Sequence, residues 1–436
     1  MTRGMLSTLT TRGRGFLSAG LTSAFCAIVL GQRDLLRVGL LLIGLPVITA
    51  LIAHRSRYLL TCSREISSTR VEVGQGATVT LTLDNPGRFP TGLMLLEDQV
   101  PYVLGTRPRF VLDQLRPRWH RSMQYIVRSE VRGRFDIGPL NVRISDPFGF
   151  VELNRSFTSR ATLIVTPQVV ALPAVRVSGD WSGTGDNRPR AFAAAGAEDV
   201  MVREYRLGDD LRRIHWRSTA RADELMVRRE EQPHQSRATL LLDTRSGAHR
   251  GAGPASSFEF AVSAVASIGA HLARQGFTVR MLTDGPPSST SDWHERGISG
   301  PAEVQLLLDS LAVMQTSARQ EFAGGGEQHS SGLVIAVLGA VSPTDLAALS
   351  RMRAGSTRCL CILLDVAAWA RADKVGAGDL ATVRNRAVTL QRQGWSVTIA
   401  GPSDRLPALW GDFATAAPAA RGDLIDAGVT ERPLSP

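Results

Sequence analysis

Two long uncharged stretches stand near the start of the chain, from Gly15 to Gly31 and from Val38 to Ala53. Each is slightly shorter than the roughly 20 residues that a membrane-spanning helix needs, but flanking residues can complete the span. A short polar loop separates them, so the pattern predicts a transmembrane α-hairpin over residues 1–59. The alternatives are a cleaved signal peptide, which should not be followed at once by a second apolar segment, and two buried helices of a soluble domain.

Basic residues flank this hairpin on both outer sides. They are Arg3, Arg12 and Arg14 before the first stretch and His54, Arg55, Arg57 and Arg64 after the second. Cytoplasmic flanks of membrane helices carry an excess of arginine and lysine. We therefore expect a membrane protein with two transmembrane helices and both termini in the cytoplasm.

Residues 60–166 show period-two alternation, for example at Val79, Leu81 and Leu83, and turn signals such as Asn85-Pro86-Gly87. Short strands without helical periods predict a small β-sandwich. We expect a turn at residues 146–149 with Phe148 filling the sandwich.

The sequence from Arg107 to Arg143 contains nine arginines and three acidic residues. A basic surface next to a membrane could meet anionic lipid headgroups, at about 1 kcal/mol per charge near the surface. A merely solvated face is an equal alternative.

From residue 237 the spacing of apolar residues changes, and short apolar strands alternate with segments that have helical spacing. Five strands in this pattern predict an α/β doubly wound parallel sheet over residues 237–416. The Gly-, Asp- and Pro-rich residues 167–236 then form a linker with a charged segment, and residues 417–436 a flexible tail. The chain is thus a membrane-anchored multidomain protein, in keeping with its 436 residues.

Composition adds little chemistry. The net charge is +10, and the positive charge is almost all from arginine, because Lys374 is the only lysine. The four cysteines have neither the number nor the spacing of a disulfide framework or a zinc knuckle, and small buried apolar residues explain them.

The densest run of charge lies between Arg203 and Glu231, with eight arginines and seven carboxylates. A net charge of only +1 disfavours nucleic-acid binding, because a protein binds the phosphate backbone through unneutralised positive charge. Carboxylates near a histidine could bind a metal ion or run acid–base chemistry, here with Glu204, Asp209, Asp210 and His215. A structural clasp of paired charges, with Gly208 in a turn and His215 and Trp216 as a partly buried anchor, is favoured.

This run resembles the signature of the bacterial family called domain of unknown function fifty-eight. The typical positions are Arg203, Glu204, Tyr205, Gly208, Asp209, Asp210, Arg213, His215, Trp216, Ala220 and Arg221. Upstream, "RGRFDIGPLNVRISDPFGF" is similar to the family's membrane-proximal β segment. The resemblance implies a protein anchored in the bacterial cytoplasmic membrane, in contact with inner membrane lipids, whose C-terminal part is von Willebrand A-like. Relatives tend to be encoded beside MoxR-type AAA+ ATPases and transglutaminase-like membrane proteins, which implies a MoxR-type ATPase as partner.

A von Willebrand A metal site places Asp-x-Ser-x-Ser after the first strand. Here the five residues are Asp243-Thr244-Arg245-Ser246-Gly247, with Arg245 and Gly247 where hydroxyl ligands would stand. A guanidinium repels a cation, so we expect a degenerate site at Asp243, no bound metal and no cofactor. Because Asp243, Asp284 and Asp365 each end a predicted strand at the ligand-binding edge, a metal or phosphate site is a minority alternative to simple strand-end caps.

The sequence therefore predicts a membrane-anchored, cytoplasm-facing interaction or adaptor protein that acts with a MoxR-type AAA+ ATPase and is not an enzyme. The signature residues would bind the partner. The alternative is a metal-dependent hydrolase using His215 and neighbouring carboxylates.

Overall fold

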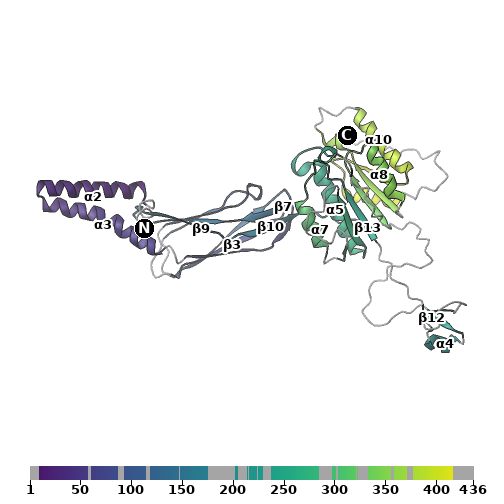
Figure 1. Cartoon of the computed structure of the whole chain (residues 1–436), viewed down its shortest axis with the longest axis horizontal. Helices are drawn as coiled ribbons and strands as arrows, with labels where there is room; N and C mark the ends of the chain where they lie inside the picture. Colours follow the sequence, from purple (N-terminus) through teal and green to yellow (C-terminus); the bar gives the residue numbers. More distant parts are fainter. Residues whose placement is uncertain are drawn as a thin grey trace. The chain divides into compact units, whose positions relative to one another are not determined.

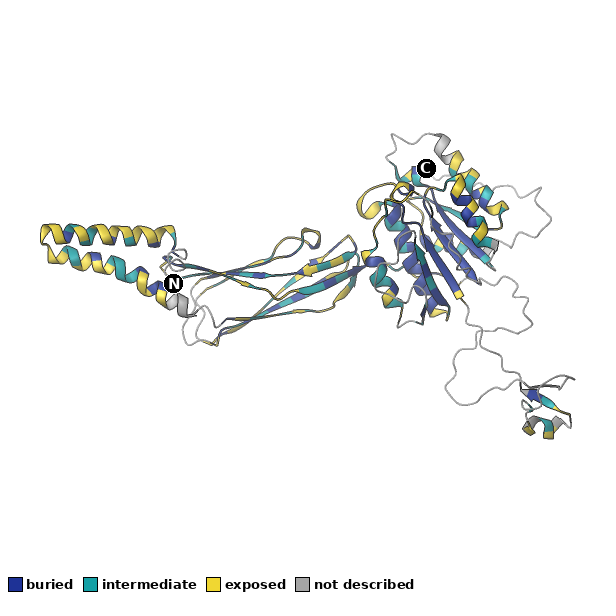
Figure 2. Cartoon of the chain, viewed as in Figure 1, coloured by how far each residue is buried: buried dark blue, intermediate teal, exposed yellow. Residues whose placement is uncertain are grey.

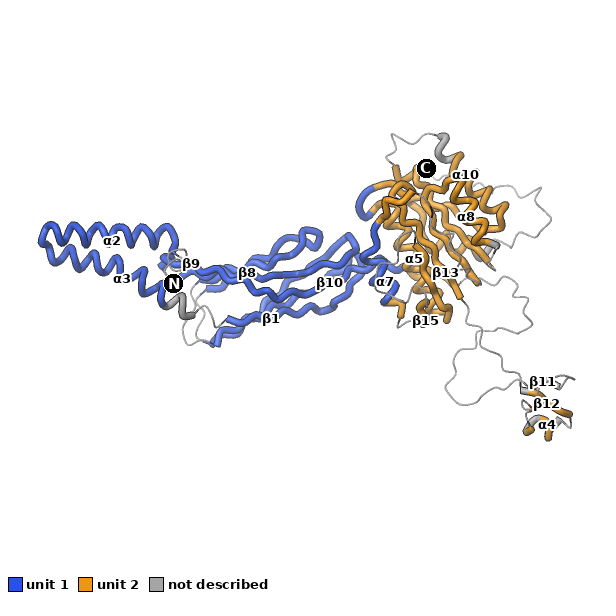
Figure 3. Tube along the Cα trace, viewed as in Figure 1, with its two compact units in different colours: residues 1–169, 252–254, 306–315 blue, residues 170–251, 255–305, 316–436 orange. Residues whose placement is uncertain are grey.

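The computed structural model divides into two compact units, shown in Figure 1 and coloured separately in Figure 3. Unit 1 comprises Met1–Val169, Ala252–Pro254 and Leu306–Gln315, and unit 2 comprises Val170–Gly251, Ala255–Gln305 and Thr316–Pro436. The structure describes residues 9–56, 60–86, 93–113, 118–146, 148–174, 202–204, 214, 216–222, 224–228, 237–283, 297–300, 303–320, 322, 332–354, 358–370 and 377–415.

Unit 1 begins with a hairpin of two helices, α2 (Thr11–Leu30) and α3 (Arg33–Ser56). Both are long and apolar enough to cross a membrane. They can pack closely because Gly39 has no side chain. A Cβ added there would lie 2.8 Å from the backbone nitrogen of Ala24. Their other faces carry exposed apolar side chains such as Phe25, which is 69% exposed, and the hairpin is largely yellow in Figure 2. The predicted pair of apolar helices is confirmed.

Ten strands of unit 1 form three sheets, in the orders β1-β3-β6, β2-β10-β7 and β5-β4-β8-β9. All pairings are antiparallel except that of β10 with β2. The strands are β1 (Thr61–Ile66), β2 (Arg70–Glu72), β3 (Gly76–Asp84), β4 (Met94–Asp98), β5 (Arg109–Leu112), β6 (His120–Arg128), β7 (Gly133–Ile137), β8 (Leu140–Ser145), β9 (Glu152–Phe157) and β10 (Ala161–Thr166).

The alternation expected in β3 is confirmed, since Val79, Leu81 and Leu83 are all fully buried. One apolar cluster joins β3 with β4 and β8, which belong to a different sheet, through residues such as Leu81, Met94 and Leu140. The sheets therefore pack by their apolar faces, as period-two patterning requires when only one face of each sheet is buried.

The turn after β8 is present, but the residue that it buries is Phe150. Phe150 is 5% exposed and joins Leu9, Ala50, Val151 and Leu153 in a cluster, whereas Phe148 is 54% exposed. The expectation for Phe148 is wrong because the Asp146 carboxylate accepts hydrogen bonds from the backbone N–H groups of both Phe148 and Val151. The resulting tight turn places Phe148 outside the cluster.

A buried ion pair lies inside unit 1. The Arg64 guanidinium donates to the Asp98 carboxylate at 2.5 Å, and their side chains are 1% and 0% exposed. The Tyr125 hydroxyl donates to the other Asp98 oxygen, also at 2.5 Å. Burial raises the pKa of Asp98, against the lowering influence of Tyr125 and Arg64. Arg64 therefore does not act as a free flanking charge, and the expectation that it helps to orient the hairpin is corrected.

Several of the arginines from Arg107 to Arg143 are likewise neutralised by acids. The pairs are Arg109 with Glu97, Arg128 with Glu130 and Arg143 with Glu152. Arg132 is only 8% exposed and donates to the carbonyls of Leu311 and Met314, two residues of the same unit. The sequence count overstated the basic face, because two of these acids lie outside the window that was counted.

Unit 2 contains a six-stranded sheet in the order β15-β14-β13-β16-β17-β18. The five predicted parallel strands are confirmed, and a two-residue antiparallel edge strand, β15, is added. The strands are β13 (Arg237–Leu242), β14 (Thr278–Thr283), β15 (Ile298–Ser299), β16 (Leu333–Leu338), β17 (Arg358–Leu364) and β18 (Ser396–Ala400). The accompanying helices are α5 (Ser257–Arg274), α8 (Pro343–Ala354), α9 (Val366–Trp369), α10 (Ala377–Arg392) and α11 (Leu406–Thr415).

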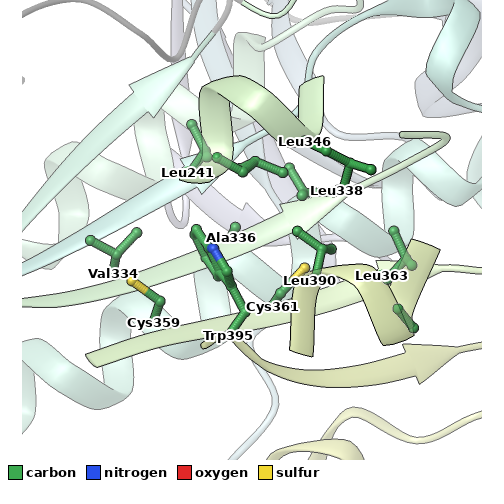
Figure 4. Close-up of a cluster of buried hydrophobic side chains, with 12 residues drawn as sticks. Leu241, Val334, Ala336, Leu338, Leu346, Cys359, Cys361, Leu363, Leu390 and Trp395 are labelled. Carbon is green, nitrogen blue, oxygen red and sulfur yellow. The ribbon is translucent and has the colours of Figure 1, made fainter. Parts of the chain in front are cut away.

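Strands β16 and β17 are buried along almost their whole length, as expected where helices cover both faces of a parallel sheet. One face packs on α8 and α10 through a cluster that includes Leu346, Leu390 and Trp395 (Figure 4). Cys359 and Cys361 point into this cluster, so the expectation that the cysteines are small buried apolar residues is confirmed for these two, whereas Cys26 and Cys62 are only partly buried. Helix α7 (Val304–Val313) is divided between the two units.

The buried Arg64–Asp98 pair yields a stability prediction. Arg64→Ala leaves a buried carboxylate without its partner, which should lower the free energy of unfolding of unit 1 by about 3–5 kcal/mol. Arg109→Ala removes one partner of an exposed pair and should cost about 1 kcal/mol or less. Hydrogen exchange at the β3 amides of the full-length protein in detergent measures both changes. Equal effects of the two substitutions would contradict a structural role for the buried pair.

Candidate functional site

The strand order of unit 2 creates a switch point at the carboxyl edge of its sheet. Strands β13 and β16 are neighbours, and from them the sheet grows outward in opposite directions. In open α/β sheets ligands bind in the crevice outside the carboxyl ends of such strands. Asp243 directly follows β13, and Gly339 directly follows β16.

Arg245 fills this point. Its Nε donates to Oδ1 of Asp243 at 3.0 Å and its Nη2 donates to Oδ2 at 2.9 Å, the bidentate geometry that gives arginine–carboxylate pairs their strength. The Asp243 side chain is fully buried and that of Arg245 is 6% exposed. Oδ1 and Oδ2 also accept hydrogen bonds from the backbone N–H groups of Arg245 and Gly339. The carboxylate is thus saturated by groups of this chain.

A second carboxylate, Asp345, completes the site. Its Oδ2 accepts from Nη1 of Arg245 at 2.9 Å, and its side chain is 4% exposed. The position is fixed by reciprocal capping at the start of α8, where the Asp345 carboxylate accepts from the backbone N–H of Ser342 and the Ser342 hydroxyl accepts from the backbone N–H of Asp345. The carboxylate that caps α8 therefore also accepts a hydrogen bond from the Arg245 guanidinium.

Two carbonyl oxygens extend this ring of acceptors. Nη1 of Arg245 donates to the carbonyl of Gln320 at 3.4 Å, and Nη2 donates to that of Ala340 at 3.3 Å. The guanidinium carbon lies 5.4 Å from the ring centroid of Phe322, within cation–π range. Burial alone disfavours the charged form, but the hydrogen bonds and charges of Asp243 and Asp345 outweigh it and raise the pKa of Arg245. The side chain is a permanent cation.

The loop after Arg245 packs against the loop after β16. A Cβ on Gly339 would lie 2.1 Å from the carbonyl oxygen of Ala248, so only glycine allows this approach. The backbone N–H of Ala340 donates to that same carbonyl at 2.8 Å. Ser317 forms an isolated parallel bridge with Arg245. These contacts close the backbone around the guanidinium.

His249 supports the backbone of Asp243 through a hydrogen bond. It is 7% exposed, its Nε2 lies 2.8 Å from the backbone carbonyl oxygen of Asp243, and its Nδ1 lies 3.2 Å from the Ser257 hydroxyl. Because a carbonyl can only accept, Nε2 carries the proton. Burial lowers the pKa of His249, which favours this neutral form. The histidine is a structural strut and presents no free basic nitrogen to solvent.

Of the other two strand-end aspartates, the structure describes Asp365, which has a capping role. Asp365 accepts from the backbone N–H of Ala368 as the N-cap of α9, which agrees with the strand-end cap interpretation. Asp284 lies outside the described residues. Among the described residues, no group of three or more histidine, cysteine or acidic side chains could hold a metal ion.

The signature segment is described only in part. Strand β11 (Val202–Glu204) pairs antiparallel with β12 (Met226–Arg228), and α4 (Trp216–Ala222) contacts β12 through a hydrogen bond from the Met226 N–H to the Thr219 hydroxyl. Trp216 is 69% exposed, so its expected partial burial is corrected: α4 directs Thr219 to the strand and leaves the indole outside. Arg221 is exposed. Outside the description lie Tyr205, Gly208, Asp209, Asp210, Arg213 and His215, and the side chains of Arg203 and Glu204.

Sequence reasoning identified Asp243 and Arg245 but missed Asp345 and His249. The local pattern Ser-Pro-Thr-Asp at residues 342–345 indicates a helix start, but nothing in it indicates a contact with Arg245, 100 residues away in the chain. His249 lies close in sequence, yet a lone histidine in a loop carries no distinguishing signal.

Residues 201–291 match the model of a family described as "Protein of unknown function DUF58". This segment belongs to the DUF58 family. The match covers the signature and extends through Asp243, Arg245 and His249, so the family expected from the sequence is confirmed. Because the function of the family is unknown, no activity follows from the match.

A distant relative supports this relationship. The chain is 26% identical over 262 residues to the uncharacterised protein YeaD of Bacillus subtilis, across 59% of this chain and 63% of YeaD. The alignment thus spans less than two thirds of the length of YeaD.

Solved structures with partial similarity include the CARDB domain of the PF1109 protein from Pyrococcus furiosus, 17% identical with a TM-score of 0.19, over 24% of this chain and 91% of that domain. Another is the sporulation control protein Spo0M of Bacillus subtilis, 8% identical with a TM-score of 0.15, over 24% of this chain and 49% of that one. These scores are too low to support any argument about fold or function.

The Arg245 site yields a stability prediction. Arg245→Ala leaves two buried carboxylates uncompensated and should lower the free energy of unfolding of unit 2 by about 3–5 kcal/mol. The exposed Arg405 of the same unit is the matched control, and Arg405→Ala should change it by about 0.5 kcal/mol or less. Urea unfolding of the full-length protein in detergent, read by hydrogen exchange at β13, measures both.

Mg²⁺ sharpens this test, because the guanidinium is surrounded by five oxygen acceptors of the kind that hard cations bind. Millimolar Mg²⁺ should restore part of the lost stability in Arg245→Ala and leave the wild type unchanged. A bound cation present at 100 times its dissociation constant would stabilise by about 2.7 kcal/mol. A Mg²⁺-dependent shift in the wild type would contradict a site filled by arginine.

His249 yields a pH prediction. Its folded pKa is lowered by burial, so near its ordinary value of about 6.5 the unfolded chain binds more protons than the folded one. The stability of unit 2 should be fully present above pH 6.5 and fall as the pH is lowered further. His249→Gln, which keeps an amide donor for the Asp243 carbonyl, should reduce this pH dependence and leave the share of the buried His271, whose pKa is also lowered. Equal pH dependence of variant and wild type would overturn the assignment.

Proposed function

We propose that this protein is a membrane-anchored adaptor whose α/β domain binds partner proteins without a metal ion, acting with a MoxR-type AAA+ ATPase. The observation that carries the proposal is the Arg245 guanidinium held between Asp243 and Asp345 at the switch point of the sheet. A cation-dependent interaction domain or a metallohydrolase needs open coordination positions there. In this chain an internal cation takes them.

The finer fold assignments belong to the same proposal. The strand order, the short antiparallel edge strand β15 and the aspartate after the first strand support a von Willebrand A-like domain in residues 237–416. The face-to-face packing of the antiparallel sheets supports a β-sandwich in residues 60–166. A von Willebrand A-like domain without its cation would serve as a rigid interaction platform.

Membrane anchoring rests on the helical hairpin. The outward faces of α2 and α3 expose large apolar residues such as Leu21, Ile28 and Leu41 at 62%, 73% and 66%. Contiguous apolar surface of this extent marks a membrane or protein contact. We place the hairpin in the cytoplasmic membrane with both termini in the cytoplasm, because Arg12 and Arg14 remain exposed at its open end. This orientation gives a cytoplasmic ATPase access to unit 2.

The signature segment is the proposed partner-binding surface. Trp216 and Arg221 on α4 are both exposed, and tryptophan and arginine are the side chains most enriched at energetically important interface positions. The alternative of a metal-dependent hydrolase rests on His215 and its neighbouring carboxylates, and no observation on the described residues favours it.

Site-directed photocrosslinking in native membranes tests the proposal. A photoreactive residue at Trp216 should capture a MoxR-type ATPase, whereas the same residue at Val111, which is 64% exposed on β5, should not. Capture should persist in excess chelator, because the Arg245 site requires no cation. The adaptor role is wrong if neither position captures the ATPase, and the metal-free mode is wrong if chelator abolishes capture.

A further inference from the structure

The turn between β8 and β9 is joined to the first turn of α2. The backbone N–H of Thr10 donates to the carbonyl of Phe150 at 2.9 Å, and the Thr10 hydroxyl donates to that of Gly149 at 2.6 Å. The same hydroxyl accepts from the N–H of Gly13 and so caps the helix. A Cβ on Gly13 would lie 2.4 Å from the carbonyl oxygen of Phe150. Within unit 1, this turn and the start of α2 thus form one rigid junction.

Three aromatic rings line this junction. The Phe16 and Phe150 ring centroids are 4.7 Å apart, and Phe148 stacks on Phe150 at 5.8 Å with an interplanar angle of 14°. Phe150 is 5% exposed, but Phe148 and Phe16 are 54% and 39% exposed. One buried ring therefore supports two that are open to the surroundings, one from the helix and one from the β turn.

The helix fixes the depth of these rings. Phe16 lies five residues beyond Thr11, the first residue of α2, which is about 8 Å along a helix axis. Phe150 contacts Thr10 through its backbone and Phe16 through its ring, so it spans this same interval. The headgroup layer on each side of a bilayer is about 5–8 Å thick. If the first turn of α2 lies at the membrane surface, Phe148 lies in the headgroup layer.

We propose that Phe148 and Phe16 form an interfacial anchor, in which the β8–β9 turn enters the headgroup layer of the membrane beside the hairpin. The occupant of this surface is lipid, because the two rings continue the exposed apolar face of α2 and are accompanied by the exposed cations Arg12 and Arg14. In helices that lie at the membrane interface, phenylalanine, leucine and tryptophan side chains enter the boundary between headgroups and acyl chains to about 5–10 Å. Arginines are enriched on cytoplasmic flanks of membrane helices. The inference rests on the proposed membrane insertion and adds that the β part of unit 1 itself touches lipid.

Added tryptophans test the anchor in the full-length protein. The variants Phe148→Trp, Phe25→Trp and Tyr102→Trp are reconstituted in vesicles of phosphatidylcholine and phosphatidylglycerol with brominated acyl chains, and each spectrum is compared with that of the wild type and its seven tryptophans. Phe25 is an exposed position in the second half of α2, five residues before the last residue, Leu30. Tyr102 is 95% exposed, and the residues beside it, Val100 and Leu104, belong to a different apolar cluster from Phe150.

We expect the added emission of Phe25→Trp and Phe148→Trp to be blue-shifted and mostly quenched, and that of Tyr102→Trp to be neither. Quenching at Phe25 without quenching at Phe148 overturns the anchor and leaves the membrane insertion intact. No quenching at Phe25 overturns both. Phe16→Trp provides a second probe of the same layer should Phe148→Trp misfold, and an unquenched Phe16→Trp beside a quenched Phe25→Trp likewise overturns the anchor.

Discussion

The placement of a permanent positive charge at the carboxyl edge of the α/β sheet, where β13 and β16 end, is the interaction on which unit 2 depends. Asp243 and Asp345 are both buried, and a nearby cation offsets the cost of several kcal/mol for removing a charge from water. Arg245 supplies that cation from two residues beyond Asp243. The glycine after β16, the cap of α8 and the strut from His249 all serve to hold the two carboxylates around one guanidinium.

Unit 1 also pairs a buried carboxylate with an arginine. Asp98 is fully buried, and Arg64 reaches it from a strand that is not a neighbour in the sheet order, while Tyr125 donates to the remaining oxygen. A buried pair of this kind need not exceed a well-packed apolar core in stability, but breaking it strands a charge. Among the described residues, each unit thus has a buried arginine–carboxylate contact that misaligned strands would break.

The sequence predicts the elements of this fold better than its contacts. Alternation at Val79, Leu81 and Leu83 reports burial directly, and apolar runs between helical patterns identify the five parallel strands. The partner of Arg245 could not be found in this way, because Asp345 reads locally as a helix cap. Phe148 and Phe150 differ by one period of a strand, so only the geometry of the intervening turn decides which ring is buried. Arg64 reads as a membrane-flanking charge until Asp98 is seen beside it.

An internal cation changes how such a domain can be regulated. A site that needs a dissociable metal responds to the concentration of that metal, whereas a guanidinium fixed by the chain responds to nothing that diffuses. Any control over the proposed partner binding must therefore act elsewhere on the molecule. The exposed signature helix α4 and the proposed membrane junction at Phe148 are surfaces where such control could act, because both present large exposed side chains. In the proposed adaptor, the Arg245 site would keep the structure of unit 2 constant while these surfaces respond.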